Sequence, residues 1–214
     1  MCNNFNDYIL PVFSEKEEST FLGTCLCIDN YVITAGHVAS GLRSSYTKSD
    51  EEWIYLDPLE LRNIPYLEGN HEPDYAAFWF DGLCSPFSFS EELPIIGDRL
   101  TIICWQKNNE GIVQCNCNCE VEEYDAEAMT FSIITDTQLH HGSSGCPVFK
   151  GNKIYGILTM GHDPDDISQL TNNARINLQK ELTTDKNKLK RCTIVKSTEL
   201  IKKMCSKKYK TSNL

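Results

Sequence analysis

Residues 141–149 read His-Gly-Ser-Ser-Gly-Cys-Pro-Val-Phe, and this stretch decides the fold. Glycines on both sides of the serine pair let the backbone turn tightly before a proline leads into a short apolar strand. Such a turn can aim the N–H groups of Gly142 and Ser144 at one point, where they would stabilise a negatively charged oxygen. A serine hydroxyl is a poor nucleophile by itself, so Ser144 needs a base from elsewhere in the chain.

Two stretches upstream carry residues suited to that task. Residues 31–38, Tyr-Val-Ile-Thr-Ala-Gly-His-Val, predict a strand that presents His37 just beyond its end. Residues 74–80, Asp-Tyr-Ala-Ala-Phe-Trp-Phe, place Asp74 at the start of an almost wholly apolar strand, hence at the rim of a sheet. Histidine suits proton transfer near neutral pH, and a carboxylate on its far ring nitrogen fixes the tautomer. Asp81, which follows the second strand, is the rival to Asp74.

Short apolar runs separated by turn residues dominate the chain and predict an all-β barrel or sandwich. The predicted strands are 8–13, 21–28, 31–34, 53–56, 75–80, 99–105, 111–121, 129–134, 147–149, 153–159 and 192–196. Helical periodicity occurs only late, where 167–182 predicts an amphipathic helix and 198–205 a shorter one. The stretch 82–98 is interpreted as a crossing between two halves.

Together, these features resemble the trypsin-like serine peptidases of the chymotrypsin fold. The resemblance rests on the order His, Asp, Ser along the chain and on the motifs Thr-Ala-Gly-His, Asp-Tyr-Ala and Gly-Ser-Ser-Gly-Cys-Pro. The bacterial-type branch, with its HtrA-like and glutamyl-endopeptidase-like members, is the more similar one. The similarity runs from about residue 20 to 161 and resumes at 193–204.

The resemblance implies a single peptidase domain of two antiparallel six-stranded β-barrels, with the site in the cleft between them. The first barrel would span about 1–88 and the second about 95–196. A helical insertion, 162–191, would interrupt the second barrel, and a short C-terminal helix with a basic tail would occupy 197–214.

The resemblance also assigns roles to individual residues. It makes His37 the general base, Asp74 its orienting acid and Ser144 the nucleophile, with an oxyanion hole from the N–H groups of Gly142 and Ser144. The residues expected to bind substrate are Gln138, His140, His141, Thr159, Met160 and Gly161. The expected reaction is hydrolysis of peptide bonds in proteins or peptides through an acyl-enzyme, with no metal and no organic cofactor.

Three positions depart from the family pattern. Cys146 stands where the family usually has glycine, but the frame Gly-x-Ser-Gly puts Ser144 at the turn and Cys146 on the outgoing strand. Ser143 replaces the aspartate that binds a freed N-terminus in secreted animal members, so that activation switch is absent. Gln138 stands at the base of the expected pocket, where no carboxylate favours cleavage after Lys or Arg.

Composition and charge narrow the function further. The chain has 214 residues, of which 41% are hydrophobic and 23% charged, as is ordinary for a globular protein. The net charge of −10 argues against nucleic-acid binding, and no apolar run is long enough to cross a membrane. No export signal is visible, so we expect a cytoplasmic protein. The basic end, 186–214, is interpreted as solubilising, with contact to an acidic partner or a nucleic acid as the alternative.

The cysteines support the same compartment. Eleven of them, an odd number, indicate mostly free thiols in a reducing environment. Cys115, Cys117 and Cys119 alternate with asparagines, so in a strand their thiols share one face. We interpret them as small residues facing the core, and a metal site is the alternative.

Two other functions stay open. A pseudo-peptidase would use the same fold only to bind peptides, and a structural β-protein would carry the motifs by accident. A cytosolic peptidase without an activation switch needs restraint, so a regulatory protein partner is also expected, with the insertion 162–191 as the natural place for it.

Overall fold

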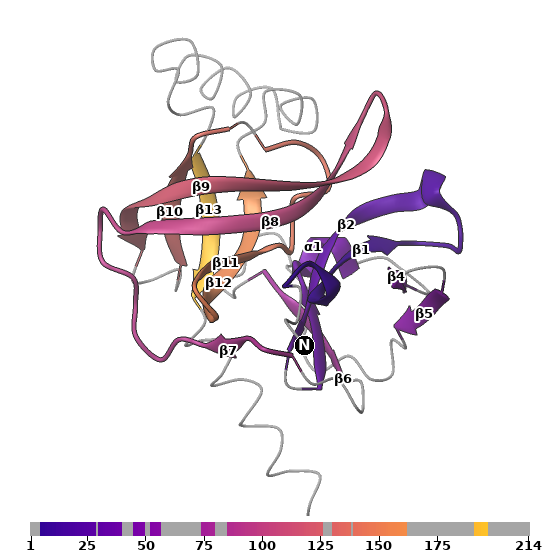
Figure 1. Ribbon diagram of the computed structural model, residues 1–214, viewed down its shortest axis with the longest axis horizontal. Coiled ribbons are helices and arrows are strands. Elements are labelled where there is room, and N and C mark those ends of the chain that lie inside the picture. Colours follow the sequence, from indigo (N-terminus) through magenta and orange to yellow (C-terminus); the bar gives the residue numbers. More distant parts are fainter. Residues whose placement is uncertain are drawn as a thin grey trace, which may run out of the picture.

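A computed structural model gives the arrangement of most of the chain (Figure 1). The residues it describes are 5–28, 30–39, 45–49, 52–56, 74–79, 85–125, 130–137, 139–161 and 191–196. Residues 162–190 of the predicted insertion, the C-terminal helix with its basic tail, and Gln138 lie outside the described residues, whereas Arg191, the last residue of the predicted insertion, belongs to a strand. The limits proposed for the single domain and its two barrels stay predictions.

Six antiparallel strands form the first sheet. They are β1 (Ile9–Phe13), β2 (Phe21–Ile28), β3 (Tyr31–Thr34), β4 (Ser45–Ser49), β5 (Glu52–Leu56) and β6 (Ala76–Trp79). Their order is β5-β4-β1-β2-β3-β6. Three short helical turns accompany them, namely η1 (Phe5–Tyr8), η2 (Glu18–Thr20) and α1 (Gly36–Ala39). Of these, α1 follows β3 directly and carries His37.

The second sheet closes on itself. Its strands are β7 (Ser88–Phe89), β8 (Arg99–Asn108), β9 (Gly111–Asp125), β10 (Thr130–Thr135), β11 (Pro147–Lys150), β12 (Lys153–Gly161) and β13 (Arg191–Lys196). The order is β11-β8-β9-β10-β13-β12-β7, and an additional pairing of β11 with β12 closes six of them into an antiparallel barrel. The predicted all-β class with two six-stranded units is therefore confirmed.

Two strands were not predicted from the sequence. Residues 45–49 form β4, which pairs with β1 and β5. The stretch 82–98, expected only to cross between the halves, contributes β7, which runs parallel to β12 and adds a seventh strand to the second sheet. Both corrections concern short segments that pair with a strand far away in the sequence, β4 with β1 and β7 with β12.

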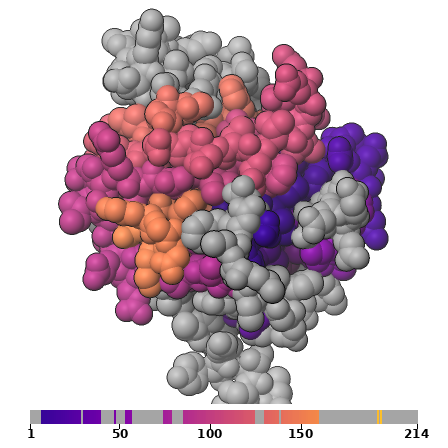
Figure 2. All heavy atoms as spheres, viewed as in Figure 1, coloured from indigo at the N-terminus to yellow at the C-terminus, as the bar shows by residue number. Residues whose placement is uncertain are grey.

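Three apolar clusters hold the sheets together. One lies inside each sheet, and the third lies between them, with both sheets contributing side chains. The cluster between the sheets contains Ile9, Leu26, Ile28, Ile33, Ala77, Ile103, Phe149, Ile154 and Ile157. Strand β2 serves two clusters, since Leu26 and Ile28 face the second sheet while Cys25 and Cys27 face the interior of the first. Burial on both faces explains why the strand sequences are almost continuously apolar. Figure 2 shows the indigo first sheet and the magenta-to-orange second sheet as adjoining parts of one surface.

The cysteine-rich strand β9 alternates as expected. Cys117 and Cys119 are buried in the second cluster, and Asn116 and Asn118 are exposed. The prediction that these thiols face the core is confirmed. In the described part of the chain, none of the eight cysteines forms a disulfide, and no group of three His, Cys, Asp or Glu side chains is placed to hold a metal ion. Nor does any described helix have the length and apolar character needed to cross a membrane.

Candidate active site

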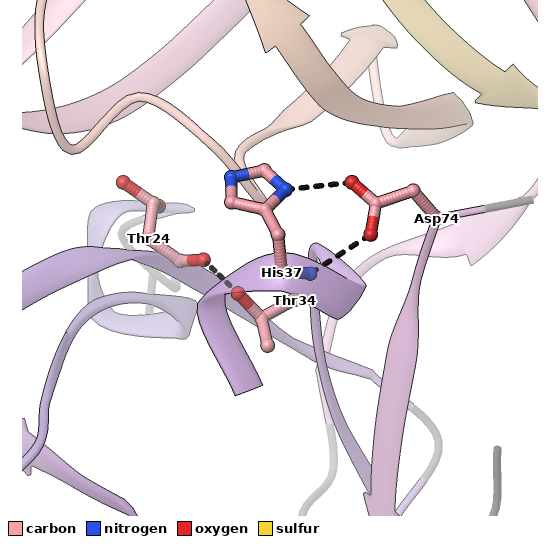
Figure 3. Close-up of polar contacts among 4 residues, drawn as sticks. All are labelled: Thr24, Thr34, His37 and Asp74. Atoms are coloured by element: carbon pink, nitrogen blue, oxygen red, sulfur yellow. Dashed lines mark hydrogen bonds and ion pairs between the residues drawn. The ribbon is translucent and has the colours of Figure 1, made fainter. Parts of the chain in front are cut away.

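The site begins with a histidine held by a carboxylate at one end of the first sheet. Strand β3 pairs with β6 so that Thr34 lies opposite Ala76, which places the helix after β3 beside the residues before β6. Asp74 accepts two hydrogen bonds from His37, one from the ring Nδ1 to Oδ2 at 2.6 Å and one from the backbone N–H to Oδ1 at 2.8 Å (Figure 3). With the proton on Nδ1, the neutral imidazole keeps its lone pair on Nε2, the atom a general base uses.

Exposure differs between the two partners. The His37 side chain is 43% exposed, whereas that of Asp74 is 15% exposed. The carboxylate is thus largely shielded from water behind a ring that solvent and substrate can reach. Asp81, the rival acid, lies outside the described residues.

Ser144 lies in a loop whose two flanking glycines cannot be replaced. We call residues 140–146 the serine loop. Gly142 and Gly145 have φ angles of 101° and 89°, a range that residues with a side chain rarely adopt. A Cβ would also lie 2.1 Å from a ring carbon of Phe21 at position 142, and 2.1 Å from the carbonyl oxygen of Thr24 at position 145. The loop is therefore pressed directly against β2.

The same packing brings the serine loop to the corner that carries the histidine. A Cβ on Gly23 would meet Val38 Cγ2 at 2.8 Å and the carbonyl oxygen of Ser144 at 3.0 Å. A Cβ on Gly145 would lie 2.4 Å from Thr34 Oγ1, at the end of β3. Ser144 is thus seated between β2 and the junction of β3 with α1, and the three sequence motifs meet at one place.

Two N–H groups of the serine loop, those of Gly142 and Ser144, point away from the carbonyl groups whose hydrogen bonds hold the loop in place. In a trans peptide the N–H points opposite to the carbonyl before it. The His141 carbonyl accepts the N–H of Lys107 at 3.2 Å, and the Ser143 carbonyl accepts the N–H three residues further along at 3.1 Å. The N–H groups of Gly142 and Ser144, on the opposite sides of those planes, donate to no acceptor among the described residues. These are the two donors that the sequence suggests for an oxyanion hole.

Buried polar bonds support the loop from the second sheet. Ser143 is buried, and its hydroxyl donates to the carbonyl of His140 at 2.8 Å while it accepts the amide of Gln106 at 3.1 Å. This network occupies the position where the resemblance would place an aspartate. Sequence reasoning missed Gln106, and also Thr24 on β2. The signal available for Thr24 is a single polar residue before the apolar run of its strand, whereas Gln106 opens a polar run and gives no such signal.

Cys146 is part of the core rather than of the reactive surface. It is fully buried among the second-sheet side chains, and that burial raises the pKa of its thiol well above the ordinary value. A hydrogen bond from Cys146 lowers the pKa of Cys104, its buried neighbour. A fully buried, protonated thiol cannot serve as a nucleophile, since the thiolate is the reactive form. Cys146 ends the serine loop one residue before β11 begins at Pro147, and its burial agrees with the frame that assigns the nucleophile to Ser144.

The residues expected to bind substrate lie at two places. Thr159 is buried in β12, and Met160 and Gly161 end that strand opposite Thr193 and Cys192. Strand β12 lies directly beside the serine loop. The Leu158 carbonyl accepts the N–H of Gly145, and the Leu158 N–H donates to the carbonyl of Cys146.

The two predicted histidines lie at the start of the serine loop. Both His140 and His141 are exposed, and the ring of His141 packs edge-on against Phe21, with the ring centres 6.4 Å apart. Gln138, the remaining predicted pocket residue, lies outside the described residues.

Comparisons with known proteins agree on the fold. No protein-family model and no curated protein sequence matches the chain. Many solved structures do match it, however. The Rv3671c protease from M. tuberculosis in its active form has a TM-score of 0.60 at 14% identity, and the match covers 93% of this chain and 80% of that one. The serine protease of a human pathogenic astrovirus has a TM-score of 0.54 at 15% identity, with 89% of each chain covered.

A further match is to a protein described as inactivated. The scabies mite inactivated protease paralogue S-D1 has a TM-score of 0.63 at 12% identity, and the match covers 94% of this chain and 93% of that one. These likenesses show that the chain has the chymotrypsin-like fold of serine proteases, as the sequence motifs predict. At such identities these likenesses show the fold alone.

Proposed function

We propose that this protein is a serine endopeptidase that hydrolyses peptide bonds through an acyl-enzyme on Ser144. One observation carries the proposal. The carboxylate of Asp74 accepts hydrogen bonds from the ring and from the backbone N–H of His37. The serine loop packs against the same corner, and two of its N–H groups donate to no acceptor among the described residues. Positioned base, orienting acid and anion site together are what acyl transfer requires.

The proposed reaction proceeds in two halves. The Ser144 hydroxyl attacks the scissile carbonyl carbon and gives its proton to His37 Nε2, while the carbonyl oxygen takes up negative charge between the N–H groups of Gly142 and Ser144. Collapse breaks the peptide C–N bond as His37 returns the proton to the leaving amine. Water then repeats the sequence on the ester and releases the acid. No step needs a metal, so a chelator should leave the rate unchanged.

A second candidate is a peptide-binding module that has lost hydrolysis. The likeness to an inactivated protease paralogue favours it, because that protein shows that this fold exists in a form described as inactive. The retained pair of His37 and Asp74 favours the enzyme, since a module that only binds has no use for an oriented base.

Labelling with a fluorophosphonate probe separates the two candidates. We expect the native protein to be labelled at Ser144, and labelling to disappear in Ser144→Ala and on denaturation. Ser132→Ala, a half-buried serine of β10, is the matched control and should label like the wild type. A native protein that folds but takes no label would favour the binding module.

The substrate is best identified from new protein ends. We expect the wild type to generate new N-termini in a cell extract that Ser144→Ala does not, and their sequences to give the residue preference at the cut. Without an acid at Gln138, no preference for Lys or Arg is expected. A set of termini common to both proteins would show that the chain cleaves nothing in the extract.

Location and regulation belong to the same proposal. The absence of disulfides among the described cysteines supports a reducing compartment, as in the cytoplasm. We propose a regulatory protein partner at residues 162–191, of which 162–190 lie outside the described residues. Replacing 165–188 by a short Gly/Ser linker should then change activity or specificity more than the melting temperature. Loss of folding in that variant would assign the segment to the core.

A further inference from the structure

Thr24 has hydrogen bonds on every polar atom and no exposed surface. It lies on β2 in the first sheet, yet most of its partners belong to the serine loop and to β8 of the second sheet. Its backbone N–H donates to the carbonyl of Ser144 at 2.9 Å, and its own carbonyl accepts the hydroxyl of Thr34 at 2.7 Å (Figure 3). The backbone of this one residue therefore links the serine loop to the strand that ends just before His37.

The Thr24 hydroxyl adds a second link to the serine loop. It accepts the backbone N–H of Trp105 at 2.9 Å and donates to the carbonyl of Gly142 at 2.8 Å. The Trp105 carbonyl also lies within reach, at 3.4 Å. A hydroxyl has only one proton, and the shorter contact is the stronger one, so the proton belongs to Gly142.

That bond fixes the glycine that would supply half of the oxyanion hole. Gly142, like Gly145, lacks a side chain and can adopt more backbone conformations than the other residues of the loop. On its N-terminal side, the preceding carbonyl is held by Lys107 of β8. On its C-terminal side, its carbonyl is held by Thr24 of β2. Together the two bonds hold the peptide planes on both sides of the Gly142 Cα. Without the second contact this Cα could shift, and the N–H group of Gly142 would be displaced with it.

We propose that the hydroxyl of Thr24 is a positioning group for the hydrolysis assigned above, on which this inference rests. It does not touch substrate. It acts through Gly142, by holding this residue, and with it its N–H group, in place beside the oxygen that becomes negatively charged in the transition state. Because such a donor matters most in the transition state, losing its alignment should lower kcat rather than raise KM.

The decisive variant is Thr24→Val, which keeps the shape of the side chain and removes the hydroxyl. We expect kcat on a peptide substrate to fall by about 10- to 100-fold, somewhat less than the loss typical of deleting an oxyanion donor, with KM changed less than about 3-fold. Thr24→Ser restores the hydroxyl and should recover most of the rate. A peptide aldehyde, whose adduct places an oxyanion in the hole, should lose affinity for Thr24→Val in proportion to kcat.

Thr47→Val is the matched control for a lost buried hydroxyl. Thr47 is also buried in the first sheet, and its hydroxyl donates to the carbonyl of Pro11 at 2.8 Å, within the sheet. It should lose stability as Thr24→Val does and keep its kcat. If Thr24→Val does not fold, Thr24→Ser and Thr24→Ala give the same comparison, since they differ by one hydroxyl.

The outcomes separate this inference from the proposed function. If the wild type hydrolyses peptides and Thr24→Val keeps its kcat and its aldehyde affinity, the inference is wrong while the proposed function stands. A fall in rate that Thr24→Ser does not recover would also overturn it, because the hydroxyl would not be the cause. A folded wild type without hydrolysis would overturn the proposed function and this inference with it.

Discussion

At the scale of single residues, Asp74 accepts hydrogen bonds from both Nδ1 and the backbone N–H of His37, and we expect its substitution to lower the rate strongly. In Asp74→Asn, an amide in place of the carboxylate would favour the wrong ring tautomer and stop stabilising the imidazolium. We expect kcat to fall by up to about 10⁴-fold. Adding Ser144→Ala to this variant should cost little more, because such residues act as a unit. Near-normal turnover by Asp74→Asn would transfer the role to another acid.

The second prediction at this scale separates Ser144 from Cys146. The Cys146 thiol is fully buried and its pKa is raised, so it stays protonated and out of reach at neutral pH. Iodoacetamide should therefore leave the activity of the native protein unchanged. Cys146→Ala should retain turnover, and Ser144→Ala should lose it with no loss of folding, as measured by circular dichroism. The reverse pattern would make Cys146 the nucleophile.

At the scale of elements, the serine loop is supported by strand β8, which is longer than the sequence predicts. Strand β8 runs to Asn108, three residues beyond the predicted end, and this extension contains Gln106. Ser143→Ala removes the partner of the Gln106 amide, which is a buried group, and should lower the free energy of unfolding by about 1–3 kcal/mol. Urea denaturation measures this loss.

The control for that prediction is the residue that follows Gln106 on β8. Lys107 donates its backbone N–H to the serine loop, and its side chain is exposed. Lys107→Ala should therefore leave the unfolding curve unchanged. Equal losses from both variants would mean that this end of β8 as a whole, rather than the Ser143–Gln106 bond, responds to substitution.

The same scale shows what can be predicted from sequence and what cannot. Long apolar strands such as β2 and β12 are recognisable because both faces are buried. The Ser-Tyr-Thr-Lys-Ser run of β4 is polar enough to resemble a loop, and the two residues of β7 are too few for a periodic pattern. The candidate site residues His37, Asp74 and Ser144 were identifiable from motifs. Thr24 was not, because its bond to Gly142 joins residues 118 positions apart and depends on how two sheets pack.

At the scale of the whole molecule, the apolar cluster between the sheets should make them unfold together. Ile33 belongs to the first sheet and is fully buried in that cluster, beside side chains of β11 and β12. Ile33→Ala should lower the free energy of unfolding by about 2–5 kcal/mol and speed hydrogen exchange in both sheets. Val12→Ala, a buried residue inside the first sheet, provides the comparison. Faster exchange confined to the first sheet in Ile33→Ala would show that the two sheets open independently.

The buried thiols have a consequence for any chain that is not yet folded. All eight described cysteines are buried or half-buried in the native structure, where none is cross-linked. In an unfolded chain they can meet one another and the chain's other three cysteines, and eight thiols alone can form four disulfides in roughly a hundred different ways. Refolding from urea in air should therefore yield several cross-linked species on a non-reducing gel. Refolding with a reducing agent should yield a single monomer band. Sensitivity to oxygen is thus a property of the unfolded chain, from which folding itself provides protection.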